Sequence, residues 1–209
     1  MRKFSTEELK NLNSQLKNST PEEIIRTILI DSSKPVVTTN FRPYEAAILH
    51  AVTNVRPGTT VVWCDTGYNT PQTYKHADDL ISQLKLNIAL YVPKQTAAYR
   101  DAINGGIPGV DSSKHEEFTR QVKLEPFQRA MAEQEPDLWF TNLRKGQTAF
   151  RDSIDILSYS KDGLLKVSPF YHWTDEELDT YLKQNHLPNE FKYFDPTKVL
   201  SNRECGLHG

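Results

Sequence analysis

The chain has 209 residues, of which 37% are hydrophobic and 25% charged, and its formal net charge is −2. These values are typical of a soluble globular protein with no bias toward nucleic acid. At this length we expect a single domain over residues 1–209, whose α/β class follows from the pattern of elements below. No apolar run approaches the ~20 residues of a membrane span, and the N-terminus lacks the apolar stretch of a secretory signal. The two cysteines lie far apart and form no disulfide framework, so we expect a reducing, cytoplasmic location.

Two capping boxes predict helices at the N-terminus. Ser5 and Glu8 begin a helix over 5–17, in which hydroxyl and carboxylate each satisfy a free amide of the first turn. Thr20-Pro21-Glu22-Glu23 repeats the pattern, with proline at the first helical position, and begins a helix that extends to about residue 31.

From residue 35 onward, apolar strand segments alternate with helical segments. Strands are predicted over 35–39, 59–64, 86–92 and 137–141, and helices over 43–55, 70–84, 95–104, 113–134 and 174–185. The fourth of these helices should consist of two pieces, because Pro126 interrupts the hydrogen-bond ladder or begins the second piece. Segments 155–160 and 164–168 flank a hairpin-like turn, and residues 186–203 show no regular period. Gly105-Gly106-Ile107-Pro108-Gly109 is interpreted as a loop or hinge within the domain. The alternation predicts a mainly parallel sheet with helices on both faces.

Polar and basic residues follow several of the predicted strands. Thr38-Thr39-Asn40 ends the first, Asp65-Thr66-Gly67 ends the second, and Arg144, Lys145 and Arg151 follow the fourth. Ligands of parallel sheets bind beyond the carboxyl ends of the strands, and guanidinium groups suit phosphates. The alternatives are ordinary helix capping for the first two segments and a solvated basic face for the third.

The C-terminus combines Cys205 with Arg203 and His208. Cationic neighbours favour the thiolate, and a chain end is the segment most prone to movement. We therefore interpret residues 201–209 as a mobile catalytic tail that carries a nucleophile, the alternative being a stray surface cysteine. Histidines occur singly, without metal-ligand spacing, so no metal site is predicted.

Five motifs follow one another along the chain: Asp65-Thr66-Gly67-Tyr68, Lys123-Leu124-Glu125-Pro126, Leu143-Arg144-Lys145 with Gln147 and Arg151, Lys166-Val167 through Trp173, and Arg203-Glu204-Cys205-Gly206-Leu207-His208. In this order they resemble the motifs of the sulfonucleotide reductases, in particular the phosphoadenosine phosphosulfate (PAPS) reductases.

The resemblance implies a Rossmann-like fold of the adenine nucleotide alpha hydrolase type that holds PAPS at the carboxyl edge of the sheet. It implies that Cys205 attacks the sulfur of the phosphosulfate, that adenosine bisphosphate leaves, and that thioredoxin or glutaredoxin releases sulfite from an S-sulfocysteine. Arg203 and His208 would steady the anion and activate the thiol, while Lys123, Arg144 and Arg151 would supply cationic partners. A homodimer is expected by the same analogy.

Cysteine content favours the cluster-free branch of the family. Adenylyl-sulfate reductases carry an adjacent cysteine pair before the middle motif, whereas this chain has none over 118–122. Two thiols do not supply the four ligands of an iron–sulfur cluster, so we expect no such cofactor, and PAPS rather than adenylyl sulfate as substrate. Cys64, at a strand end among apolar residues, is expected to be buried and structural.

Two departures from the family pattern alter the expected anion site. Segment 38–45 contains no glycine, and within it Pro43 has no amide hydrogen to donate, Arg42 adds charge and Glu45 is expected to add repulsion. The segment between the last predicted helix and Cys205 is also shorter than is typical of the family.

Three functions therefore remain open from the sequence. The first is a thioredoxin-dependent PAPS reductase. The second is a relative of the same fold that hydrolyses or transfers another adenine nucleotide, although no Ser-Gly-Gly-Lys-Asp-Ser-like loop is present. The third is a nucleotide-binding protein without catalysis.

Overall fold

A mainly parallel sheet forms the centre of the protein, whose computed structural model describes residues 3–198. Within these residues the strands are β1 (Pro35–Thr39), β2 (Thr60–Cys64), β3 (Asn87–Tyr91), β4 (Leu138–Phe140), β5 (Leu157–Tyr159) and β6 (Leu165–Val167). Their order is β3-β2-β1-β4-β6-β5, and β5 pairs with β6 in the antiparallel direction, while the other neighbours are parallel. The expected α/β class and the hairpin-like turn are confirmed.

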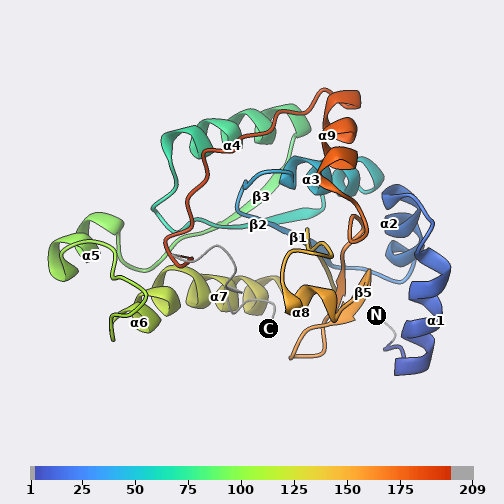
Figure 1. The fold of residues 1–209 in the computed structure, drawn as a ribbon, viewed down its shortest axis with the longest axis horizontal. Helices are drawn as coiled ribbons and strands as arrows, with labels where there is room; N and C mark the ends of the chain where they lie inside the picture. Colours follow the sequence, from blue (N-terminus) through green and yellow to red (C-terminus); the bar gives the residue numbers. More distant parts are fainter. Residues whose placement is uncertain (1–2, 199–209) are drawn as a thin grey trace.

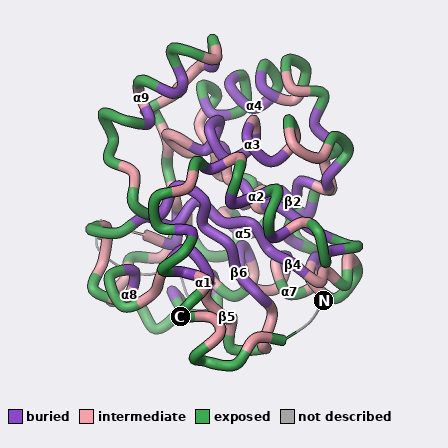
Figure 2. The backbone as a smooth tube through the Cα atoms, turned by 90° about the vertical axis from the view of Figure 1, so that its right-hand side faces the viewer, coloured by how far each residue is buried: buried purple, intermediate pink, exposed green. Residues whose placement is uncertain are grey.

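Helices cover both faces of this sheet (Figure 1). They are α1 (Thr6–Leu16), α2 (Pro21–Leu29), α3 (Glu45–Val55), α4 (Pro71–Leu84), α5 (Ala97–Asn104), α6 (His115–Thr119), η1 (Arg120–Leu124), α7 (Glu125–Gln134), α8 (Ala149–Asp152) and α9 (Asp175–Gln184). In Figure 1, α3, α4 and α9 lie above the sheet, and α6 and α7 lie below it. The tube in Figure 2 shows buried residues concentrated in the strands and on the inner sides of these helices.

Alternating side chains of the strands divide the core in two. Val37 and Val61 face the larger cluster, which α2, α3 and α4 cover, whereas Val36 and Val62 face the smaller cluster between the sheet and α7. Successive strand residues point to opposite faces, and in β1, β2 and β4 both faces are buried, so these strands contain apolar runs rather than an alternation, whereas Leu90 of the edge strand β3 is exposed.

The predicted N-terminal capping boxes are both present. The Ser5 hydroxyl accepts from the Glu8 amide while the Glu8 carboxylate accepts from the Ser5 amide, and Thr20 and Glu23 do the same. The third helix begins two residues later than predicted, at Glu45. Phe41 and Tyr44 both adopt positive φ (53° and 68°), so the chain turns tightly before it can become helical.

The predicted break at Pro126 takes a form that the sequence did not indicate. Helix α6 continues without a gap into η1, a π-helical turn, and then into α7, in whose first turn Pro126 lies. Because the three segments form one continuous helix, Pro126 has no amide hydrogen to donate to the turn before it, and the π-helical turn lies at this interruption of the ladder. The wider π-helical turn places Lys123 among the buried residues.

Asp137 joins the starts of β1 and β4. Its carboxylate accepts hydrogen bonds from the Ser32 hydroxyl (2.6 Å), from the Ser33 amide (2.7 Å) and hydroxyl (2.9 Å), and from the Lys34 amide (3.1 Å). Burial alone would raise the pKa of Asp137, but these bonds hold it below its ordinary value.

Asp137→Ala should lower the free energy of unfolding by about 1–3 kcal/mol at pH 7. Because the pKa is lower in the folded chain than in the unfolded one, this contribution is complete above about pH 4 and disappears as the pH falls through the folded value. Urea unfolding at pH 7 and pH 3 measures it. The difference from wild type should shrink at pH 3, and Asp78→Ala, at an exposed helix position, should change little at either pH. A difference that grows on acidification would contradict the assignment.

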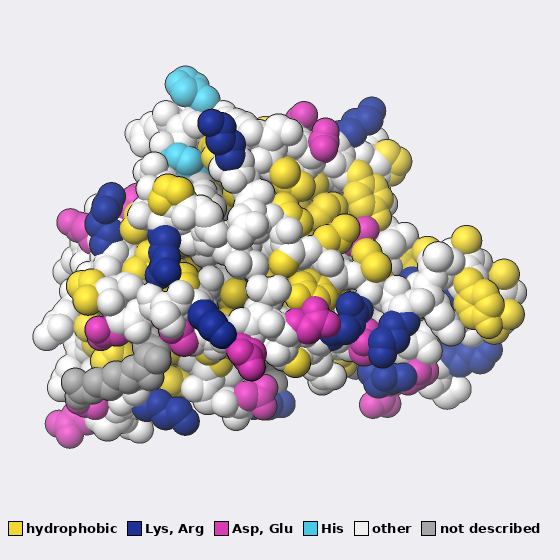
Figure 3. Space-filling view, turned by 180° about the vertical axis from the view of Figure 1, so that it is seen from behind, with side chains coloured by type: hydrophobic (Ala, Val, Ile, Leu, Met, Phe, Trp, Pro, Cys, Tyr) yellow, Lys and Arg dark blue, Asp and Glu magenta, His cyan; other side chains and the backbone are white. Residues whose placement is uncertain are grey.

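No helix in the stretch 3–198 is long and apolar enough to cross a membrane. Seen from behind, side chains of both charge signs are interspersed with apolar ones, and apolar side chains gather at the end of the molecule that α5 forms (Figure 3). Tyr99 and Ile103 are exposed there.

Candidate functional site

A pocket lies at the carboxyl ends of β1 and β4. These two strands are neighbours in the sheet, and the chain order reverses between them, since β2 and β3 extend to one side of β1 and β4 lies on the other. Open α/β sheets bind ligands at such a switch point. The pocket brings together five of the residues predicted from the sequence, namely Thr38, Thr39, Asn40, Lys123 and Arg151.

The loop after β1 is organised around Glu45. Its carboxylate accepts from the Thr39 hydroxyl (2.8 Å), the Asn40 amide (2.8 Å) and the Arg42 Nε (2.7 Å), and its side chain is 6% exposed. We expected Glu45 to add repulsion in this loop; its hydrogen bonds to Thr39 and Asn40 and its ion pair with Arg42 were not expected. Thr38 lies beside this group, and its hydroxyl accepts from the indole nitrogen of Trp139 at 2.9 Å.

Lys123 is a buried cation of the pocket that forms an ion pair. Its ammonium donates to Asp195 at 2.5 Å and to the Thr197 hydroxyl at 3.3 Å, and the side chains of Lys123 and Asp195 are 4% and 8% exposed. Burial would raise the pKa of Asp195, but the Lys123 ammonium and the Thr197 hydrogen bonds lower it below its ordinary value. Asp195 is therefore a carboxylate at neutral pH.

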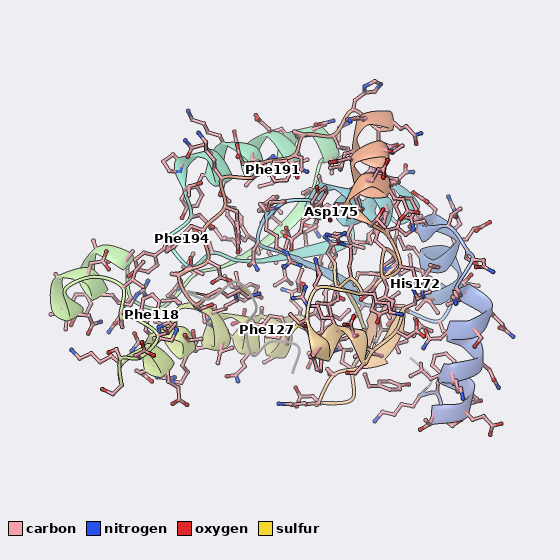
Figure 4. The ribbon with its side chains drawn as sticks, in the orientation of Figure 1. Phe118, Phe127, His172, Asp175, Phe191 and Phe194 are labelled. Atoms are coloured by element: carbon pink, nitrogen blue, oxygen red, sulfur yellow. The ribbon has the colours of Figure 1, made fainter. Side chains whose placement is uncertain are left out.

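Asp195 reaches Lys123 because the segment after α9 crosses the carboxyl edge of the sheet. Thr70 and Thr73, at the start of α4, both donate to the Lys192 carbonyl, at 2.6 and 3.2 Å. In Figure 4, Phe191 and Phe194 mark the course of this segment from α4 toward the sheet. The part of this segment from Tyr193 to Lys198, for which the sequence showed no regular period, thus forms one wall of the pocket.

Arg151 enters the pocket from α8, a single helical turn. Its side chain is buried, and it donates to the Gln147 side chain, while the Tyr171 hydroxyl donates to the Arg151 carbonyl at 2.7 Å. Nearby, Asn142 is 7% exposed, and its side-chain oxygen has no hydrogen-bond donor among the described residues. A ligand that donates a hydrogen bond would satisfy this oxygen.

Asp65, Thr66 and Gly67 end β2 but do not line the pocket. The Asp65 carboxylate accepts from the Gly67 amide (2.9 Å), the Asn69 side chain (2.9 Å) and the Tyr74 hydroxyl (3.0 Å). Thr66 is buried, and Gly67 has φ +80°, a conformation that L side chains rarely adopt. In this structure the segment stabilises its own turn.

Arg144, Lys145 and Gln147 also lie outside the pocket lining. The Arg144 guanidinium pairs with Asp175 at 2.5 Å and lies 5.3 Å from the centre of the Tyr44 ring. Lys145 is exposed, and its amide donates to the Tyr171 carbonyl at 2.9 Å. The Gln147 side chain accepts a hydrogen bond from Arg151, which lines the pocket. Their contact with a substrate stays a prediction.

Sequence reasoning missed several polar residues of the pocket: Arg42 and Glu45 as a hydrogen-bonded pair, Thr141, Asn142, Tyr193, Asp195 and Lys198. Thr141 and Asn142 directly follow β4, so the rule on strand ends that selected Thr39 and Asn40 could have found them. Nothing in the local pattern marks Asp195, because its partner is 72 positions away.

Cys64 lies on the apolar side of the pocket, together with Val62, Phe127 and Leu143. It is buried, as expected, and burial raises the pKa of its thiol to about 12, although Lys123 and Arg129 act in the opposite direction. A thiol with this pKa is protonated at neutral pH and is a poor nucleophile.

In folded protein at pH 8, Cys64 should react with iodoacetamide about 10³-fold more slowly than in urea, because so little thiolate is present. Peptide mapping after timed alkylation measures this rate separately from that of Cys205. Rapid modification of Cys64 in the folded protein would contradict its assignment as a structural thiol.

The predicted catalytic residues Arg203, Cys205 and His208, with the tail 201–209, lie outside the described residues. Among residues 3–198, no group of three or more histidine, cysteine or acidic side chains is placed to hold a metal ion.

A mainly parallel sheet with a cation-lined pocket at its switch point defines the class of α/β proteins that bind nucleotides or other anions at this edge. The phosphoadenosine phosphosulfate reductase domain matches residues 34–194, so the chain belongs to the PAPS reductase family. The fold and the family that the sequence motifs indicated are thereby confirmed.

Curated relatives agree with this membership, and a solved structure shares the fold. Phosphoadenosine 5'-phosphosulfate reductase of Xylella fastidiosa (strain M23) is 34% identical over 188 residues, which cover 87% of this chain and 77% of the relative. The protein of the same name from Photobacterium profundum is 34% identical over 96% of this chain and 88% of its own. The phosphoadenylyl-sulfate reductase of Candida auris, solved as a phosphate complex, has a TM-score of 0.78 at 22% identity and 90% coverage of both chains.

A more distant structure shares only the fold. The U34-tRNA thiolase NcsA of Methanococcus maripaludis, solved with its [4Fe-4S] cluster, has a TM-score of 0.57 at 9% identity, covering 90% of this chain and 69% of its own.

Proposed function

We propose that this protein reduces 3'-phosphoadenylyl sulfate to sulfite and adenosine 3',5'-bisphosphate through an S-sulfocysteine at Cys205, with thioredoxin or glutaredoxin as the reductant. Membership in the family makes the chain a sulfur-group oxidoreductase that acts on this nucleotide. The observation that carries the proposal is the pocket at the β1–β4 switch point, into which the buried cations Lys123 and Arg151 project.

The proposed reaction has three displacements. The Cys205 thiolate attacks the sulfur of the phosphosulfate, the bond between that sulfur and the bridging phosphate oxygen breaks, and adenosine 3',5'-bisphosphate leaves. A thiolate of the reductant then attacks the Cys205 sulfur, and sulfite leaves with the electron pair of the S–S bond. The second thiol of the reductant resolves the mixed disulfide.

Binding and charge stabilisation fall to the pocket residues. Lys123 and Arg151 stabilise the phosphate that leaves, because buried cations act strongly on charge that develops in a site shielded from water. Thr38, Thr39, Asn40 and Asn142 line the pocket, and the Asn142 side-chain oxygen, which has no donor among the described residues, offers a hydrogen bond to the substrate.

The other predicted residues keep roles that follow from the family resemblance. Arg203 and His208 activate the thiol, and the remaining predicted residues bind the substrate from outside the pocket lining described above, namely Asp65, Thr66, Gly67, Arg144, Lys145 and Gln147.

The proposed chemistry uses no iron–sulfur cluster. The whole sequence contains two cysteines, and such clusters are held by about four thiolates. Cys64, one of the two, is a buried protonated thiol, so the electrons must come from a partner protein. A homodimer, a cytoplasmic location and the absence of nucleic-acid binding belong to the same proposal.

Sulfite release tests the proposed function. Purified protein with thioredoxin, its reductase and NADPH should release sulfite from PAPS. The kcat/KM for adenylyl sulfate should be lower by about 10²-fold or more, because this substrate lacks the 3'-phosphate and the charged contact that the phosphate makes. Equal values for the two substrates would contradict PAPS specificity. An absence of sulfite with both, despite nucleotide binding, would contradict the reductase assignment.

A further inference from the structure

The donors that usually hold a substrate anion at the first strand of such a sheet are already taken by a side chain. The Thr39 hydroxyl, the Asn40 amide and the Arg42 Nε all converge on the Glu45 carboxylate, within 2.7–2.8 Å. A strand-end amide, a hydroxyl and a guanidinium beside a helix N-terminus are the donor set that a phosphate or sulfate oxygen prefers.

Glu45 holds this position firmly. It is the first residue of α3, where a carboxylate is stabilised by the helix dipole, and its side chain is 6% exposed. It lines the pocket, so an anion that enters faces its negative charge across a partly desolvated space. Arg42 also donates to the Asn142 carbonyl at 3.3 Å, which ties the closed loop to the end of β4.

We propose that Glu45 is a specificity-determining residue that closes the β1–α3 loop to anions. It directs the charged groups of the substrate to the Lys123 and Arg151 side of the pocket, and it discriminates against nucleotides with a polyphosphate chain. The inference rests on the proposed function for the identity of the substrate, but its mechanism concerns anion binding alone and is measured without turnover.

Inorganic pyrophosphate is the direct probe. Glu45→Gln keeps the shape of the side chain and one acceptor oxygen but removes the negative charge, so an entering anion is no longer repelled and Arg42 no longer pairs with a carboxylate at this position. By titration calorimetry, the Kd of pyrophosphate should fall at least tenfold relative to wild type. The matched control Glu7→Gln removes the same charge from exposed helix α1 and should leave the Kd within about twofold.

The opposite result would overturn the proposal. If folded Glu45→Gln binds pyrophosphate no more tightly than wild type, Glu45 is only a structural cap. Glu45→Ala, in which no side chain covers the donors, should show the same gain. Circular dichroism and thermal unfolding identify folded variants.

Wild-type protein provides a measurement that needs no variant. It should bind ATP at least tenfold more weakly than adenosine 3',5'-bisphosphate, and equal affinities would contradict the discrimination. Because these titrations follow binding only, a failure here leaves the sulfite assay unaffected. Conversely, a failure of the sulfite assay leaves the anion measurement valid.

Discussion

Replacing Cys205 by serine is expected to lower the rate of sulfite release by at least about 10³-fold. A serine hydroxyl is a weak nucleophile at neutral pH, and it cannot form the S–S bond that the reductant must break. The Kd of adenosine 3',5'-bisphosphate should stay within about twofold of wild type, because the cations assigned to binding come from η1 and from α8. Thioredoxin-coupled turnover and equilibrium titration measure the two effects.

Residual turnover of Cys205→Ser near the wild-type rate would remove this thiol from the mechanism. A loss of nucleotide affinity as large as the loss of turnover would instead assign Cys205 to binding.

Lys123→Met should be the most destabilising of the substitutions considered, by about 3–5 kcal/mol, because it leaves Asp195 charged and buried without its partner. Methionine preserves most of the side-chain volume, so the loss reports charge rather than packing. Urea unfolding measures the stability, and PAPS kinetics measure the function.

The double variant Lys123→Met with Asp195→Asn separates the two roles of this lysine. It removes both charges together and should recover most of the lost stability, while kcat/KM for PAPS stays at least about tenfold below wild type. If the double variant recovers stability and kcat/KM alike, Lys123 serves only to hold the segment after α9.

Much of the fold follows from local sequence. The capping boxes at Ser5 and Thr20 predicted the starts of α1 and α2, because the residues that satisfy the free amides are neighbours in the chain. The apolar strand segments predicted a sheet buried on both faces. The start of α3 was missed because the left-handed conformation of Phe41 and Tyr44 is imposed by contacts of the loop, and their residue types do not favour it.

The candidate site was predictable only in part. Rules on strand ends located Thr38, Thr39 and Asn40, whose backbone position decides their place in the pocket. The pairs Lys123–Asp195 and Arg144–Asp175 depend on how distant segments pack, and the sequence pattern contains no signal for them. Glu45 was identified as a repulsive charge in the first loop, but its three hydrogen bonds to donors of that loop were not predicted.

The central claim is covalent sulfur transfer to Cys205, and the most direct test is the intact mass of reduced protein after incubation with PAPS in the absence of a thiol donor. The account predicts a mass gain of one sulfonate, located at Cys205 by peptide mapping and removed by thioredoxin with release of sulfite. An unchanged mass, in protein that demonstrably binds the nucleotide, would contradict it.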